Sequence, residues 1–169
     1  NHWIDDETTG LVSEPVSRGD TSPYTRFLAV TAAGLRAPWL VPFDAGRTRR
    51  DRFTVENGPP IDIRMMELAS DQLRRAEGPG WQAVELPYLG EELALDLVLP
   101  VGGPLRDLEA TVDEPWLQRV FVALDRAAPG AVELRVPRTA CTTSLDLRDA
   151  LRRRGVTAAC DRTADFSGI

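Results

Sequence analysis

Residues 85–100 read Glu-Leu-Pro-Tyr-Leu-Gly-Glu-Glu-Leu-Ala-Leu-Asp-Leu-Val-Leu-Pro, and this stretch decides the fold. Apolar side chains recur at every second position on both sides of a glycine: Val84, Leu86 and Tyr88 before it, then Leu93, Leu95 and Leu97 after it. A period of two is typical of β-strands, and Gly90 with Glu91 can supply a turn between them. The stretch therefore predicts a β-hairpin.

The end of the second strand departs from this alternation. Val98 and Leu99 are consecutive apolar residues, which is typical of a strand that is covered on both faces. Pro100 has no backbone N–H to donate and limits the strand. We expect the second strand to become buried on both faces as it approaches Pro100.

The residues before the hairpin predict one helix end and several strands. Residues 3–9 fit the last turns of a helix that Gly10 terminates, and 11–24 fit a loop. The unbroken apolar run 27–30 predicts a central strand covered on both faces. Residues 53–55 and 61–65 predict two more strands about the turn 57–60, with the charged segment 47–52 as an interruption.

The residues after the hairpin predict helices around one further strand. Asp113 can cap a helix that has Pro115 in its first turn, and the apolar positions on one face of that helix are Leu117, Val120, Phe121 and Leu124. Alternation at Val132, Leu134 and Val136 predicts a strand. Strands and helices mix without a βαβ rhythm, so we expect an α+β fold.

A last helix is predicted near the C-terminal end of the sequence. Thr143 or Ser144 can cap it, and Asp146 and Asp149 lie near its positive end. Arginines 152–154 lie near its negative end, and Gly155 can stop it in a left-handed conformation.

Composition excludes several classes of function. The 169 residues are 43% hydrophobic, enough for one domain with its own core. A net charge of -6 argues against a nucleic-acid partner, and no run of 18 apolar residues could span a membrane. Cys141 and Cys160 are too few for a disulfide framework or a four-ligand metal site, and whether they pair stays open.

Catalytic side chains are also scarce. His2 is the one histidine, so no Ser-His-Asp or Cys-His set can be assembled, and no His/Cys cluster has metal-ligand spacing. We expect a protein that is not an enzyme and that has no catalytic residue, metal or cofactor.

Motifs in a fixed order carry a resemblance to a known family. They are 25–32 with Trp39 and Pro42-Phe43, then Met65-Met66, Leu86-Pro87-Tyr88, Val136-Pro137-Arg138, Leu145-Asp146-Leu147 with Leu151 and Gly155, and finally 164–168. In this order and at these spacings the chain resembles a serpin, and the opening residues 1–10 fit the end of serpin helix F. The resemblance covers 1–169 and implies a partial serpin domain, with parts of sheets A, B and C and helices F (its end), G, H and I.

The resemblance implies a serine-type endopeptidase inhibitor that acts by suicide. A protease cleaves an exposed reactive-centre loop, and the loop then inserts into sheet A as a new strand. The partner implied is a serine protease, or a cysteine protease, and the complete protein would be a monomer. A non-inhibitory serpin-like binding, carrier or chaperone protein is the alternative.

The resemblance also assigns roles to residues. The segment with Thr25, Phe27, Leu28 and Val30 is similar to a strand of sheet A beside which the loop inserts. Trp39 resembles the tryptophan of the breach, where insertion begins, and Arg138 matches a basic residue near it. Thr31 stands where serpins usually place the asparagine of the shutter, and a hydroxyl cannot supply the two donors of an amide.

The same resemblance gives expectations about the chain as a whole. It implies an internal piece of a serpin that lacks the N-terminal helices and the reactive-centre loop, so the reactive bond is absent and the piece alone would be inactive. Family members are mostly secreted, which implies an extracellular protein, with the cytoplasm as the alternative. The target protease is not implied.

Overall fold

The computed structural model describes residues 2–12, 16, 19–26, 28, 30, 35–56, 58–138, 140, 147–161 and 164–167. The side chains at 148 and 160 are outside this description. The chain divides into two units, residues 1–36 with 141–169 and residues 37–140, and each is described by itself.

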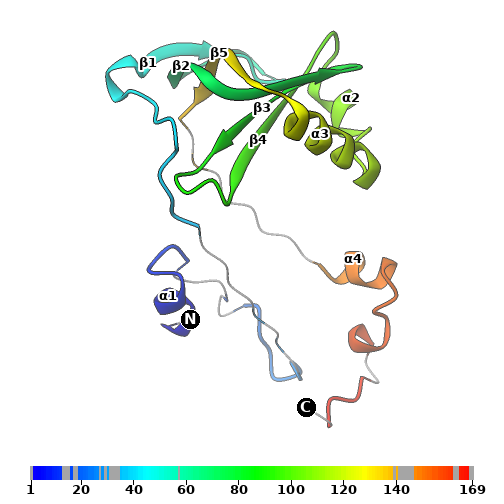
Figure 1. The fold of residues 1–169 in the computed structure, drawn as a ribbon. Coiled ribbons are helices and arrows are strands. Elements are labelled where there is room, and N and C mark those ends of the chain that lie inside the picture. The colour runs from blue at the N-terminus through cyan, green and yellow to red at the C-terminus, as the bar shows by residue number, and fades with distance from the viewer. Residues whose placement is uncertain are drawn as a thin grey trace. The chain divides into compact units, whose positions relative to one another are not determined.

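The larger unit, 37–140, is built on an antiparallel five-stranded sheet (Figure 1). Its strands are β1 (Arg49–Phe53), β2 (Ile61–Gly78), β3 (Trp81–Pro87), β4 (Ala94–Pro100) and β5 (Pro129–Pro137). The order is β1-β2-β3-β4, and β5 also pairs with β2. The first part of β2 pairs with β1 and β5, while its last four residues, 75–78, pair with β3. The α+β class predicted from the sequence is confirmed.

The predicted hairpin is confirmed as β3 and β4. The register pairs Val84 with Leu97 and Leu86 with Leu95, and the Tyr88 N–H donates to the Leu93 carbonyl at 2.9 Å. Gly90 has a φ of 101°, the left-handed region that glycine enters without steric cost. The alternation of apolar residues therefore located both strands and the turn between them.

Helices complete this unit. They are the short 3-10 helix η1 (Ala45–Arg47), α2 (Leu105–Glu109) and α3 (Glu114–Arg126). The cap predicted for α3 is confirmed, because the Asp113 carboxylate accepts a hydrogen bond from the Trp116 N–H at 2.7 Å. The buried face of α3 is Trp116, Val120 and Leu124, whereas the predicted face residues Leu117 and Phe121 are exposed at its margin.

Two apolar clusters lie on opposite faces of β3. Leu68, Leu73, Val84, Leu86 and Val132 form one cluster. Trp81, Ala83, Trp116, Val120 and Leu124 form the other, in which the Trp81 and Trp116 rings meet edge to face at 6.1 Å. Because successive side chains of a strand point to opposite faces, β3 can contribute to both clusters.

The strand predicted to be buried on both faces is therefore the wrong one. Leu99 of β4 is 55% exposed, while β3 has buried side chains on both of its faces. The physical reason is position: β3 lies between β2 and β4, whereas β4 is the last strand of the described sheet. The strand at residues 53–55 was also misplaced, because β1 lies in the charged segment that we expected to interrupt the fold, and β2 continues 13 residues past Met65 to Gly78.

The smaller unit contains α1 (His2–Glu7), α4 (Arg148–Arg153) and a 3-10 helix, η2 (Ala158–Cys160). Both predicted glycine stops are confirmed, with a φ of 78° at Gly10 and 90° at Gly155. After α4 the Gly155 N–H donates to Arg152 and the Val156 N–H donates to Leu151, the paired bonds of a Schellman cap. The predicted cap of this helix, Thr143 or Ser144, is wrong for α4, because its N-cap is Leu147, which makes no side-chain hydrogen bond. Asp146 lies outside the described residues.

The central strand predicted at 27–30 is not present in its described residues. Leu28 and Val30 belong to no strand and are 49% and 38% exposed. A strand must pair its backbone N–H and C=O groups with a neighbour, and no described residue pairs with this segment. Phe27 and Ala29 lie outside the described residues.

Candidate functional site

The aromatic side chains before the sheet gather around the end of the hairpin. Trp39 forms an isolated antiparallel bridge with Tyr88, and their rings stack with centroids 4.4 Å apart and planes 13° apart. Phe43 meets the Trp39 ring edge to face at 6.5 Å. Offset and edge-to-face contacts of this kind stabilise aromatic pairs beyond the area that they bury.

Backbone hydrogen bonds hold the same segment against the hairpin. The Leu40 N–H donates to the Pro87 carbonyl at 2.9 Å, and the Leu89 N–H donates to Pro38 at 2.8 Å. Residues 38–40 thus lie as a short extension beside the end of β3. The sequence singled out Trp39 but missed Tyr88 as its partner, although the Leu86-Pro87-Tyr88 motif was itself conspicuous.

Arg138 lies directly after β5. Its backbone N–H donates to the Arg64 carbonyl of β2 at 2.8 Å, and its side chain is exposed. The backbone contact continues the pairing of β5 with β2 by one residue beyond Pro137.

The residues assigned to loop insertion belong to the smaller unit. Thr25 closes a turn, since its N–H donates to the Ser22 carbonyl and its hydroxyl accepts from the Ser22 N–H. Leu28 and Val30 are exposed. Thr31 and Phe27 lie outside the described residues, so their predicted roles stay predictions. Trp39 and Arg138 belong to the other unit.

A group of acidic side chains lies across the hairpin and α3. Glu85 and Asp96 face each other in the register of β3 and β4. Burial raises the pKa of Asp96, and the nearby carboxylate of Asp125 raises it further. Burial also raises the pKa of Glu85; Arg74, whose Nη1 lies 3.5 Å from Glu85 Oε1, lowers it, while Asp96 and Asp125 raise it again.

One oxygen of this group is unsatisfied. Asp96 Oδ1 is buried and has no hydrogen-bond partner in the structure. A buried carboxylate oxygen without a donor costs free energy, which agrees with the raised pKa. A neighbouring cavity of about 350 Å³ is lined by Arg74, Glu85 and Asp125 among others. This group was not predictable from the sequence, because Asp96 occupies an ordinary polar position in an alternating strand.

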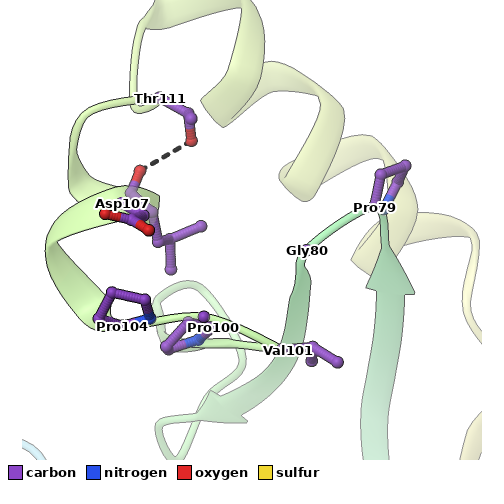
Figure 2. Close-up of a pocket in the computed structure, with 10 residues that line it drawn as sticks. Pro79, Gly80, Pro100, Val101, Pro104, Asp107 and Thr111 are labelled. Carbon is purple, nitrogen blue, oxygen red and sulfur yellow. Dashed lines mark hydrogen bonds between the residues drawn. The ribbon is translucent and has the colours of Figure 1, made fainter.

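A second cavity of about 190 Å³ lies between the β2–β3 turn, the end of β4 and α2 (Figure 2). Its walls include Pro79, Pro100 and Pro104, and its one ionisable side chain is Asp107. The Thr111 hydroxyl donates to the Leu108 carbonyl at 2.7 Å. One carboxylate and one hydroxyl that is already bonded do not make a nucleophile and base pair.

Metal-ligating side chains approach one another at the start of α1. Ligand atoms of His2, Asp5 and Asp6 all lie within 4.8 Å of one another, and His2 Nδ1 is 3.6 Å from Asp6 Oδ1. The His2 and Asp6 side chains are 90% and 69% exposed. Exposed acidic groups of this kind are common without an ion, so the geometry identifies no metal centre. Among the described residues, no helix is long and apolar enough to cross a bilayer.

The comparisons with known proteins agree on one family. A family model described as Serpin (serine protease inhibitor) matches residues 1–169. The chain is 32% identical to Serpin B6 of Macaca fascicularis over 174 residues, which is 100% of the chain and 46% of the relative. It is 31% identical to a serpin-like protein of Thermococcus kodakarensis over 100% of the chain and 38% of the relative.

Solved structures show the same fold. Emu (Dromaius novaehollandiae) ovalbumin matches with a TM-score of 0.81 at 21% identity, over 100% of the chain and 44% of ovalbumin. A thyroxine-binding globulin complexed with thyroxine-fluorescein matches with a TM-score of 0.78 at 23% identity, over 99% of the chain and 49% of the globulin. The chain thus spans less than half the length of these relatives.

Proposed function

Because the chain belongs to the serpin family, we propose that the full-length product of its gene inhibits a serine-type endopeptidase. The observation that carries this proposal is the match of the serpin family model to every residue from 1 to 169. The name Serine protease inhibitor, borne by a relative from Cyanea capillata that is 26% identical over 100% of the chain, supports the same class of activity.

The proposed mechanism is suicide inhibition by loop insertion. The protease cleaves a reactive-centre loop and is trapped as an acyl-enzyme when the loop enters sheet A as an added strand. Insertion releases strain stored in the fold, so the driving energy resides in the scaffold and no catalytic group is required of this chain.

In this proposal residues 1–169 belong to the scaffold that accepts the reactive-centre loop. In the full-length protein the segment with Thr25, Phe27, Leu28 and Val30 would become the strand beside which the loop inserts, although Leu28 and Val30 belong to no strand in this chain, and Thr31 would lie in the shutter. The stack of Trp39 on Tyr88 supports a role for Trp39 as a rigid aromatic at the breach. Arg138 follows β5 and its side chain is exposed, so it is available for an ion pair near the breach.

We infer the domain organisation, oligomeric state and cellular location of the full-length protein from its membership of the serpin family. Residues 1–169 form part of a single serpin domain that is a monomer when complete, is secreted, and lacks activity as an isolated piece. The cytoplasm is the alternative location.

A non-inhibitory binding or carrier protein is the second candidate function. The observation in its favour is Thr31 in place of the shutter asparagine, together with residues 33–38 (Ala-Gly-Leu-Arg-Ala-Pro), which stand where serpins have an aromatic-rich stretch. Both changes remove side-chain volume or hydrogen-bond donors from the region that must accept the loop.

Progressive inhibition separates the two candidates. The full-length gene product is incubated at equimolar concentration with each member of a panel of trypsin-like, chymotrypsin-like, elastase-like and papain-like proteases, and residual activity is followed with time. We expect activity of at least one serine protease to fall progressively. Full activity throughout the panel, with a cleaved loop, would favour the non-inhibitory protein.

A further inference from the structure

Three arginines form a row across β1, β2 and the residue that follows β5. Figure 1 shows these three strands together in the larger unit. The register of β1 and β2 places Arg50 directly opposite Arg64. The Arg138 N–H donates to the Arg64 carbonyl at 2.8 Å, which places Arg138 opposite Arg64 on the other side. Residues that are directly opposite in an antiparallel sheet project to the same face. We call Arg50, Arg64 and Arg138 the arginine row.

The row differs from its surroundings because no acidic residue of the described sheet lies directly opposite any of its members. All three side chains are exposed, and within the described part of the chain none of them forms an ion pair. Arg135 of the same sheet, by contrast, pairs with Asp51 and lies 3.6 Å from Glu67.

Like charges directly opposite each other destabilise a sheet. A fold that retains three of them side by side, while neutralising Arg135 nearby, maintains a positive site at a cost in stability. Arg47, just before β1, is also exposed, whereas Arg52 of β1 lies opposite Asp62.

We propose that the arginine row binds an acidic segment of a partner protein. Neighbouring strands lie about 4.8 Å apart, so the row is about 10 Å long and matches two or three carboxylates of a peptide. Guanidinium groups bind carboxylates through two parallel hydrogen bonds, which makes the contact specific in geometry as well as favourable in charge. This surface is independent of the proposed inhibition.

Charge complementarity selects a short acidic peptide over a long polyanion. The protein as a whole carries a net charge of -6, and repulsion by that field grows with the charge of the ligand. A sulfated or phosphorylated polymer would therefore meet more opposition than a segment with two or three carboxylates that fits the row.

The test measures peptide binding to the full-length gene product. The probe is a fluorescein-labelled peptide of alternating Glu and Ser, and its partner probe has Gln at every Glu position. Fluorescence anisotropy is recorded at low and physiological salt for the unaltered protein, for Arg50→Gln with Arg64→Gln, and for the control Arg119→Gln with Arg126→Gln. The two control arginines are exposed residues of α3, away from the sheet edge.

We expect the Glu peptide to bind, the Gln peptide not to bind, and salt to weaken the complex. Loss of Arg50 and Arg64 should weaken binding about tenfold, since an exposed ion pair contributes up to a factor of about five. The control should bind as the unaltered protein does. Equal affinity of the row variant and the control would overturn the proposal, as would tighter binding of a sulfated oligosaccharide that depends on the same arginines.

Discussion

Gly78 is the residue at which the geometry is least tolerant of change. It ends β2, and a Cβ atom there would lie 2.6 Å from Cε2 of the buried Trp81 ring. Gly78→Ala should lower the free energy of unfolding by about 1–3 kcal/mol, because the indole would have to move within a packed cluster. Thermal unfolding of the full-length protein measures this change.

Gly130 supplies the matched control. It lies in β5, and a Cβ atom at this position would contact nothing within 4 Å. Gly130→Ala should therefore leave the unfolding temperature nearly unchanged. Equal losses for the two variants would mean that the contact with Trp81 is not the cause.

Asp96 should make stability depend on pH. Its pKa is raised above 3.8 in the folded protein, so its contribution to stability is fully present below the unfolded pKa and is lost as pH rises through the folded value. Asp96→Asn should raise the free energy of unfolding by about 0.5 kcal/mol at neutral pH, where Asp96 faces the charged Glu85.

The pH dependence of that gain is the informative measurement. Unfolding temperatures at about pH 7.5 and about pH 4 should show the gain shrinking in acid, where Asp96 of the unaltered protein binds a proton and becomes neutral, as Asn is at both pH values. Asp62→Asn is the control, since Asp62 is an exposed strand residue opposite Arg52. A gain for Asp96→Asn that is the same at both pH values would contradict the account.

At the scale of elements, α3 depends on its cap. Asp113 accepts the Trp116 N–H at 2.7 Å and orients the first turn that carries the buried Trp116 ring. Asp113→Ala should cost about 1 kcal/mol in the free energy of unfolding, while Asp113→Asn should retain most of it, because Asn is an equally good cap. Urea unfolding of the two variants tests this order, and an Asn variant as unstable as the Ala variant would refute it.

The elements that were predictable from sequence are those with a clean period or a specific end signal. The hairpin of β3 and β4 follows from its alternating leucines, and α3 follows from Asp113 and its apolar face. The length of β2 could not be predicted, because Ser70, Asp71 and Gln72 lie in its middle, at the point where its pairing with β5 changes register.

Other features of the elements depend on neighbours that sequence alone does not reveal. The charged β1 is a strand because it pairs with β2 along its whole length, not because its residues favour strands. Burial of both faces belongs to β3 because α3 covers one face, a tertiary fact that the apolar pair Val98-Leu99 of β4 does not encode.

At the scale of the whole molecule, the order of motifs identified the family, while the site depended on geometry. The resemblance singled out Trp39 for the breach, which stays a prediction, and could not supply Tyr88 as its stacking partner. The arginine row and the buried oxygen of Asp96 arise only when strands far apart in sequence are placed in register.

Covalent trapping of a protease by the full-length gene product is the central proposal. The direct measurement is the mass of the species formed when the full-length gene product meets a protease that it inhibits, after denaturation in detergent. Covalent trapping predicts a new species whose mass is that of the protease plus that of the inhibitor, minus the peptide that cleavage of the loop releases. Two separate species, intact protease and cleaved inhibitor, would contradict it.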